Sequence, residues 1–183
     1  MPDELNIFAF LYLEPDQGTP IKGEAQDCYH TDEIQVLTYS FGVSNPDAGK
    51  AGAGKEKSKS EVDKVVLSTV FSKASPQLFL SSARGDKFKC ATISVRKLGP
   101  QDKWDADYHQ VQLCDVYITR YSLKAGDSVR PTEELTLGFQ TIDISYRQQD
   151  EKGNLGPNAF TAAWSANLHK KIDSQLTVPY PSS

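Results

Sequence analysis

The chain has 183 residues, 38% of them hydrophobic and 24% charged, and its formal net charge is −4 at neutral pH. This length is typical of a single domain that buries roughly two-thirds of its unfolded surface. The acidic balance argues against a nucleic-acid partner, which needs a basic stripe, and no segment has the apolar length expected of a membrane-inserted helix.

An unbroken apolar run at residues 7–13 follows Asp3 and Glu4 and precedes Glu14. A secretory signal peptide needs positive charge before such a run and a small-residue cleavage site after it. Seven apolar residues instead suit a strand buried on both faces. We expect the first strand of the mature protein here, and synthesis in the cytoplasm without a signal peptide.

The segment 33–43 is rich in β-branched and aromatic residues. Ile34 and Val36 alternate with polar neighbours, and the phase then slips by one residue so that Tyr39, Phe41 and Val43 alternate instead. Alternation predicts a half-buried strand, and the slip predicts a β-bulge within it.

Strand patterns recur along most of the chain, near residues 6–13, 33–43, 62–71, 88–98, 108–123, 134–146 and 159–168. The phase slips again in two of these runs, once near Cys114 and Asp115 and once after Phe139. Such slips are typical of bulges, turns and barrel corners. The sequence therefore predicts an all-β, mainly antiparallel sandwich or closed barrel.

One segment has the pattern of a short helix. Ser75 is a candidate cap, Pro76 suits the first helical position, and Gly85 suits the left-handed stop. We expect the apolar face of this helix to consist of Leu78, Phe79 and Ala83.

The last strand run has two alternating sets of side chains. We expect its larger set to face the core, namely Phe160, Ala162, Trp164, Ala166 and Leu168. The small polar residues between them suit solvent, a neighbouring subunit or the lining of a wet channel, and the candidates are Thr161, Ser165 and Asn167.

Three segments have loop composition. Residues 45–60 contain four lysines and no large apolar side chain, and residues 150–158 form a shorter polar link. Residues 173–183 are expected to be a flexible C-terminal tail that follows a domain of residues 1–172.

The three cysteines, Cys28, Cys90 and Cys114, lie far apart and show no C-x-x-C spacing. An odd number without metal spacing is typical of reduced thiols in a cytosolic protein. We expect Cys90 and Cys114 to be small buried side chains within strands.

Two motifs imitate ligand sites. Residues 49–55 fit G-x-x-x-x-G-K, but Glu56 stands where a phosphate-binding loop needs Ser or Thr. Asp102, Asp105, Asp107 and His109 have spacing that could imitate a metal site, although hairpin ends commonly carry the same residues.

No catalytic constellation emerges from the sequence. Neither His30 nor His169 lies near a nucleophile motif, and we expect both at the surface. Glu133 and Glu134 follow Pro131 and are expected to begin a strand rather than to form an acid–base pair. The sequence therefore predicts no enzyme, no cofactor and no metal.

The amino-acid sequences of several segments resemble the haemolysin-coregulated protein (Hcp) family of bacterial type VI secretion. Ile21-Lys22-Gly23-Glu24 followed by residues 33–43 is similar to the family's I-x-G-E-S-x-D and E-I-x-V-L-x-x-S-x-G-V stretches. Residues 72–78 resemble its D-K-A-S-P-x-L segment, and residues 91–97 its A-x-L-x-V-R-K strand. Trp164, Ser165, Asn167, Lys170 and Lys171 complete the set, which keeps the family's order.

This resemblance implies a β-barrel with one flanking helix, similar to phage tail-tube proteins. It also implies hexameric rings that stack into a tube, which a contractile sheath expels from the cell. The implied partners are further copies of the chain, the sheath and tip (spike) proteins, and effectors carried in the lumen.

The family carries a long, variable loop at the position of residues 45–60. The resemblance therefore places contacts between stacked rings on this loop, with the candidates Asn45, Lys50, Lys55, Lys57 and Lys59.

Two other functions stay open at the level of sequence. A monomeric barrel could bind a small apolar ligand in its interior, and a secreted effector or toxin could use the same fold. The residues after 172 are too few for a catalytic domain. The molecular mass in solution separates a ring from a monomeric barrel.

Overall fold

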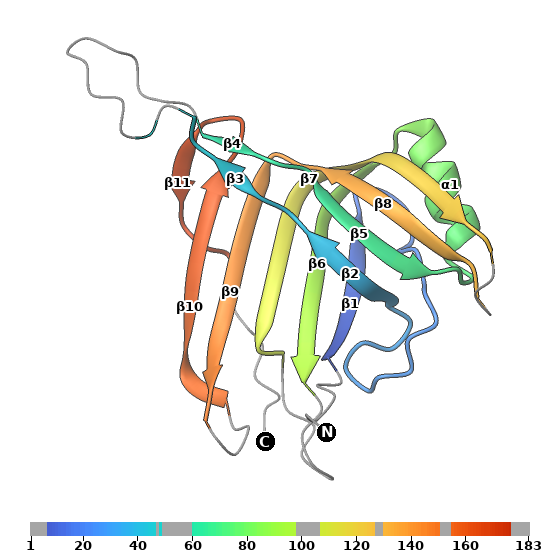
Figure 1. Ribbon diagram of the computed structural model, residues 1–183, viewed down its shortest axis with the longest axis horizontal. Coiled ribbons are helices and arrows are strands. Elements are labelled where there is room, and N and C mark those ends of the chain that lie inside the picture. The colour runs from blue at the N-terminus through green and yellow to red at the C-terminus, as the bar shows by residue number, and fades with distance from the viewer. Residues whose placement is uncertain are drawn as a thin grey trace.

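The computed structural model describes residues 7–46, 48, 60–97, 107–126, 130–150 and 155–176. Antiparallel strands dominate these residues, and one short helix accompanies them (Figure 1). The elements are β1 (Ile7–Pro15), β2 (Ile34–Ser40), β3 (Val43–Ser44), β4 (Glu61–Val62), β5 (Val65–Val70), α1 (Ser75–Arg84), β6 (Lys87–Lys97), β7 (His109–Lys124), β8 (Thr132–Gly138), β9 (Thr141–Gln149), β10 (Leu155–Ser165) and β11 (Lys170–Ile172). The predicted fold class is confirmed.

Six strands close into a barrel in the order β7-β6-β1-β2-β5-β8, because β8 pairs back onto β7. The edge of β7 that pairs with β8 also pairs with β9, which continues through β10 to β11 outside the barrel. We call these three strands the extension, and Figure 1 shows them on the side of the barrel away from α1. The short β3–β4 ribbon flanks the segment of residues 47–59.

The long strand β7 changes partner near its middle. Its last pair with β9 is Cys114 with Thr141, and its first pair with β8 is Tyr117 with Gly138. Asp115 lies between them with a φ of 54°, and the register with β8 shifts again between Ile118 and Arg120. The slip predicted near Cys114 therefore marks the point at which the extension leaves the barrel.

The bulge predicted in residues 33–43 is also present. Val36 pairs with Thr69 and Thr38 pairs with Ser68, so Leu37 is the extra residue on β2. The side chain of Leu37 is 49% exposed, whereas Val36 is 5% exposed. After the bulge, Tyr39 of β2 and Phe41, which follows the strand, pack against the core.

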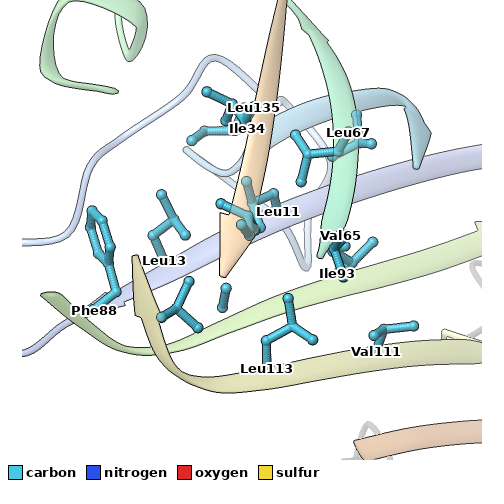
Figure 2. Close-up of a cluster of buried hydrophobic side chains, with 14 of the residues drawn as sticks. Leu11, Leu13, Ile34, Val65, Leu67, Phe88, Ile93, Val111, Leu113 and Leu135 are labelled. Atoms are coloured by element: carbon cyan, nitrogen blue, oxygen red, sulfur yellow. The ribbon is translucent and has the colours of Figure 1, made fainter. Parts of the chain in front are cut away.

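Alternate residues of the barrel strands fill its interior (Figure 2). Each fully buried leucine or valine contributes about 1.5–3 kcal/mol relative to an exposed position. The labelled members of this core are Leu11, Leu13, Ile34, Val65, Leu67, Phe88, Ile93, Val111, Leu113 and Leu135.

The helix α1 ends at Gly85, whose φ of 71° supplies the predicted left-handed stop. Ser75 is the first residue of the helix and makes no capping bond, so its predicted role was wrong. Leu78 is buried as predicted, but Ala83 is exposed and Phe79 is 57% exposed. Phe79 instead packs edge-on against Tyr121 at 5.8 Å between ring centroids.

No helix in the described ranges is long and apolar enough to cross a lipid bilayer.

The burial predicted for the last strand run was wrong in part. Phe160 and Leu168 are 64% and 60% exposed, whereas Ala163 and Ser165 are buried. Of the larger set, Trp164 packs against the core. The reason is that β10 lies in the extension, where the barrel interior no longer covers one face along its whole length.

The state predicted for two cysteines was also wrong. Cys90 of β6 and Cys114 of β7 are cross-strand partners and form a disulfide, with 4.1 Å between their Cα atoms. Cys28 is a free, exposed cysteine. Pairing across adjacent strands brings together two thiols that are 24 residues apart in sequence.

Candidate functional site

Residues 21–33 fold back on themselves beside the start of β2. The amide of Gly23 donates to the carbonyl of Asp32 at 2.7 Å, and that of Ala25 donates to the carbonyl of Glu33 at 3.1 Å. A Cβ at Gly23 would lie 2.2 Å from the carbonyl oxygen of Glu33. Only glycine lets the two segments approach this closely.

This folded segment is tied to the residues that precede α1. Asp32 accepts from the ammonium groups of Lys73 at 3.0 Å and Lys22 at 3.1 Å, and these bonds and charges lower the pKa of Asp32. Glu24 accepts from the backbone amide of Lys73 at 2.8 Å. Two segments that the sequence separates by about fifty residues therefore form one surface.

A buried carboxylate anchors the start of α1 to the barrel wall. Glu133 of β8 is 1% exposed and accepts hydroxyl groups from Thr69 at 2.9 Å, Ser75 at 3.0 Å and Tyr121 at 2.8 Å. Burial and the hydrogen bond to Glu133 raise the pKa of Tyr121. Glu133 lies within a strand as predicted, and three donors offset the cost of its desolvation.

A second buried polar cluster fixes the other end of the 21–33 segment. His30 Nδ1 lies 3.0 Å from Glu33 and its Nε2 lies 2.9 Å from Asp107. The imidazole stacks on Phe10 of β1 at 4.5 Å between centroids. Because a carboxylate only accepts hydrogen bonds, this geometry requires both ring nitrogens to carry a proton.

The protonation of His30 follows from two opposed effects. Burial alone would lower its pKa, but the hydrogen bonds and negative charges of Asp107 and Glu33 outweigh burial and raise the pKa to about 9. The pKa of Asp107 is lowered, because the bonds and charges of His30 and Arg96 outweigh its own desolvation. His30 is 6% exposed, so the prediction that it lies at the surface was wrong.

Arg96 extends the His30 cluster across β6. Its guanidinium donates to Asp27 at 2.9 Å and to Asp107 at 3.4 Å, and it lies 4.6 Å from the ring centroid of Tyr29. Asp107 thus forms ion pairs with two cationic side chains, His30 and Arg96. Among the described residues no three ligating side chains could hold a metal ion, and Asp102 and Asp105 lie outside those residues.

The extension carries exposed aromatic side chains on the face that continues from the barrel interior. Tyr146 of β9 pairs with Phe160 of β10, and their exposures are 46% and 64%. Tyr108 packs edge-on against Tyr146 at 6.3 Å. We call Tyr146, Phe160 and the exposed Ala162 beside them the aromatic face of the extension.

The outer edge of β10 is only partly covered. β11 pairs with Ala163–Ser165, and no other strand of the described part of the chain pairs with that edge at residues 159–162. Exposed amide and carbonyl groups on such an edge are a template for pairing with another chain.

The candidate interface or lumen residues lie at the end of this strand. Thr161 and Asn167 are exposed, whereas Ser165 is 2% exposed. The Ser165 hydroxyl donates to Asn167 at 2.8 Å within the β10–β11 turn, and Asn167 donates to Gln140 at 3.3 Å. Their role in an assembly stays a prediction, with only Thr161 and Asn167 available to a neighbour.

One further contact, on Asp143 of β9, was not predicted from the sequence. This carboxylate accepts from the hydroxyl of Ser174 at 2.8 Å and from the backbone amides of Gln175 at 2.6 Å and Leu176 at 3.1 Å. The first residues after β11 therefore lie across the outer face of β9.

The predicted stacking loop is described only at its base. Asn45 is exposed and its carbonyl accepts from the amide of Ala48 at 3.1 Å. The structure does not describe Lys50, Lys55, Lys57 or Lys59. Residues 49–55, which imitate a phosphate-binding loop, also lie outside the described residues.

Comparison with known proteins identifies the family. The family described as "Type VI secretion system effector, Hcp" matches residues 10–146. The chain belongs to the Hcp family. This range contains every strand of the barrel except the first residues of β1, together with α1 and most of β9. Hcp proteins are structural secretion proteins and not enzymes.

Relatives and solved structures agree with this assignment. Protein hcp1 of Pseudomonas aeruginosa is 28% identical over 155 residues, covering 84% of this chain and 93% of that protein. A solved type six secretion system protein has a TM-score of 0.77 at 20% identity, covering 91% and 99% of the two chains. Hcp1 from Salmonella typhimurium has a TM-score of 0.67 at 24% identity, covering 90% and 99%. These structures share the fold.

We predict that Gly23→Ala destabilises the protein by at least about 2 kcal/mol, because the added Cβ overlaps the Glu33 carbonyl. Gly126→Ala is the matched control, since nothing lies within 4 Å of its added Cβ, and we expect a change within about 0.5 kcal/mol. Urea denaturation measures both. Equal midpoints for the two variants would contradict the close approach.

The His30 cluster predicts a stability that depends on pH. The folded-state pKa of about 9 exceeds the ordinary 6.5, so the contribution is complete below pH 6.5 and is lost as pH rises through 9. The loss is on the order of 3 kcal/mol. Denaturation from pH 6 to 9.5 should show this decline in the parent chain and lose it in His30→Asn.

The control for that experiment is His169→Asn, because His169 is exposed and its φ of 48° suits asparagine. It should keep the parent's slope. If His30→Asn also keeps that slope, His30 is not the group responsible.

Proposed function

We propose that this chain is the subunit of a type VI secretion inner tube, and that six copies close into a ring around a central channel. Membership of the Hcp family supports the secretion role. The observation that carries the proposal is the aromatic face of Tyr146 and Phe160 beside a partly uncovered strand edge. A second copy would cover both.

The extension is suited to a ring interface on physical grounds. It projects from one side of a closed barrel, and in the proposed ring it lies against a different surface of the next copy. Such a head-to-tail contact closes into a ring when its rotation divides a full turn. Burying exposed aromatic side chains drives this association.

Stacked rings then form the tube. The chain is made in the cytoplasm and leaves the cell when the contractile sheath expels the tube with its tip (spike) proteins. Effectors travel in the lumen, where Thr161 and Asn167 are candidate lining or interface residues. The subunit works by assembly, and it makes or breaks no bond in its cargo.

Contacts between rings are assigned to residues 45–60. Lys50, Lys55, Lys57 and Lys59 would meet acidic groups of the next ring, each pair contributing on the order of 1 kcal/mol or less. With six copies of the loop at each junction between rings, the small free energies of these ion pairs would add up. The resulting association weakens with salt.

The packing of the barrel argues against the alternative of a ligand-binding barrel. Leu11, Leu67, Ile93, Leu113 and Leu135 are each at most 1% exposed and lie in one cluster. Their side chains occupy the interior in which an apolar ligand would bind. A secreted effector on the same fold remains the second candidate, and release of a monomer would favour it.

Ring formation is tested with Phe160. The parent chain should elute at about six times 20.2 kDa, measured by size exclusion with light scattering. Phe160→Asp places a charge on the aromatic face and should raise the assembly concentration by roughly 30- to 100-fold. Phe160→Leu keeps an apolar side chain and is the control. A parent chain of single mass at all concentrations and salts would refute the proposal.

Stacking is tested separately by deleting residues 48–58. We expect rings with the same number of subunits, because the deletion spares the barrel and the extension, but fewer and shorter tubes in negative-stain images. Replacing the four lysines of residues 50–59 with glutamine should weaken stacking in the same direction. Unchanged tube length after the deletion would remove the loop from the ring contact.

A further inference from the structure

The disulfide lies at the junction between barrel and extension. Cys114 is the last residue of β7 to pair with β9, through Thr141, and its carbonyl accepts from Gln140 at 3.0 Å. Cys90 pairs with Glu14 of β1 in the other direction. One cross-strand row thus runs from the barrel through both sulfurs into the extension, where Thr141 pairs with Ser165 of β10.

The strands keep their register without help from this bond. β6 and β7 keep one register on both sides of it, from Lys87 with Tyr117 to Val95 with His109, although Lys89 has no partner in this ladder. The neighbouring Ala91 and Leu113 point into the core and are fully buried. The backbone is therefore held by hydrogen bonds and packing, and the same fold can exist with the bond open or closed.

The sulfurs also lie where small molecules can reach them. Because Ala91 and Leu113 face inward, Cys90 and Cys114 face outward by alternation, and both are half-buried rather than buried. Lys89 beside them is exposed and pairs with Glu14 at 2.7 Å. Thiol–disulfide exchange needs this kind of access.

We propose that Cys90 and Cys114 form a redox-controlled cross-link, a dithiol in the reducing compartment where the chain is made and a disulfide once the chain reaches an oxidising medium. The compartments rest on the proposed export, whereas the switch itself does not. Closing the bond fastens the junction from which the extension projects.

The chemistry balances with a small-molecule disulfide, such as glutathione disulfide, as the oxidant. One cysteine thiolate attacks it, forms a mixed disulfide and releases one small thiol. The second cysteine thiolate attacks the protein sulfur of that mixed disulfide and releases the other small thiol. Two protein thiols are oxidised, one small disulfide is reduced to two thiols, and two electrons are transferred.

The switch is tested on the full chain carrying Cys28→Ser, which removes the exposed third thiol. The protein is equilibrated in buffers of reduced and oxidised glutathione, alkylated under native conditions and weighed by mass spectrometry. We expect each chain to carry either two alkyl labels, on Cys90 and Cys114, or none. The reduced and oxidised forms should share one circular dichroism spectrum. The Tm of the oxidised form should be about 5–10 °C higher.

Three results would overturn the switch. They are labelling only after unfolding, two free thiols in fully oxidised buffer, and a Tm that does not respond to oxidation. The variant with both Cys90→Ser and Cys114→Ser is the control and should lose the redox response of the Tm. If this double variant fails to fold, the number of alkyl labels on Cys90 and Cys114 in the chain carrying Cys28→Ser still decides whether the cross-link responds to redox conditions.

The compartments are tested in the cells that produce the chain, by acid quenching and alkylation of cell pellet and medium. We expect two labels on the pellet form and none on the exported form. The same state in both would overturn the compartment assignment. Absence of the chain from the medium would refute the proposed export on which that assignment rests, while the measurements on purified protein would still decide the switch.

Discussion

The pairing of β7 with two different strands along one edge is the constraint on which the architecture depends. The first half of this edge pairs with β9 and the second half with β8, and the change occurs at Asp115. Pairing with β8 closes the barrel and buries its interior. Pairing with β9 directs the remaining strands outward, so the extension cannot bury both of its faces within one subunit.

Two buried polar clusters hold the connecting segments on this framework. Glu133 fastens the start of α1 through three hydroxyl groups, and the His30 cluster fastens residues 21–33. The partners in each cluster offset the cost of burying its charges. Removing one partner from such a cluster commonly costs about 3–5 kcal/mol, because it leaves a buried charge without compensation. Two segments whose sequences resemble the family, at Gly23–Glu24 and Lys73–Ser75, are thus in tertiary contact with each other.

Local features of the fold could be predicted from the sequence, and non-local ones could not. The slip after Val36 and the stop at Gly85 depend on neighbouring residues, and both are present. The burial of His30 depends on Asp107, 77 residues away. The Cys90–Cys114 bond depends on the register of two strands, and the exposure of Phe160 on β10 lying outside the barrel. The candidate site could be predicted only as a strand, because its proposed role depends on contact with another copy of the chain.

The central claim is that the barrel is complete within one chain and that the extension is completed by another. Amide hydrogen exchange followed by mass spectrometry tests this directly, at concentrations below and above assembly. The account predicts that the edge-facing amides of residues 159–162 exchange slowly only in the assembled state, while those of β6 are protected in both. Equal exchange of residues 159–162 at all concentrations would contradict it.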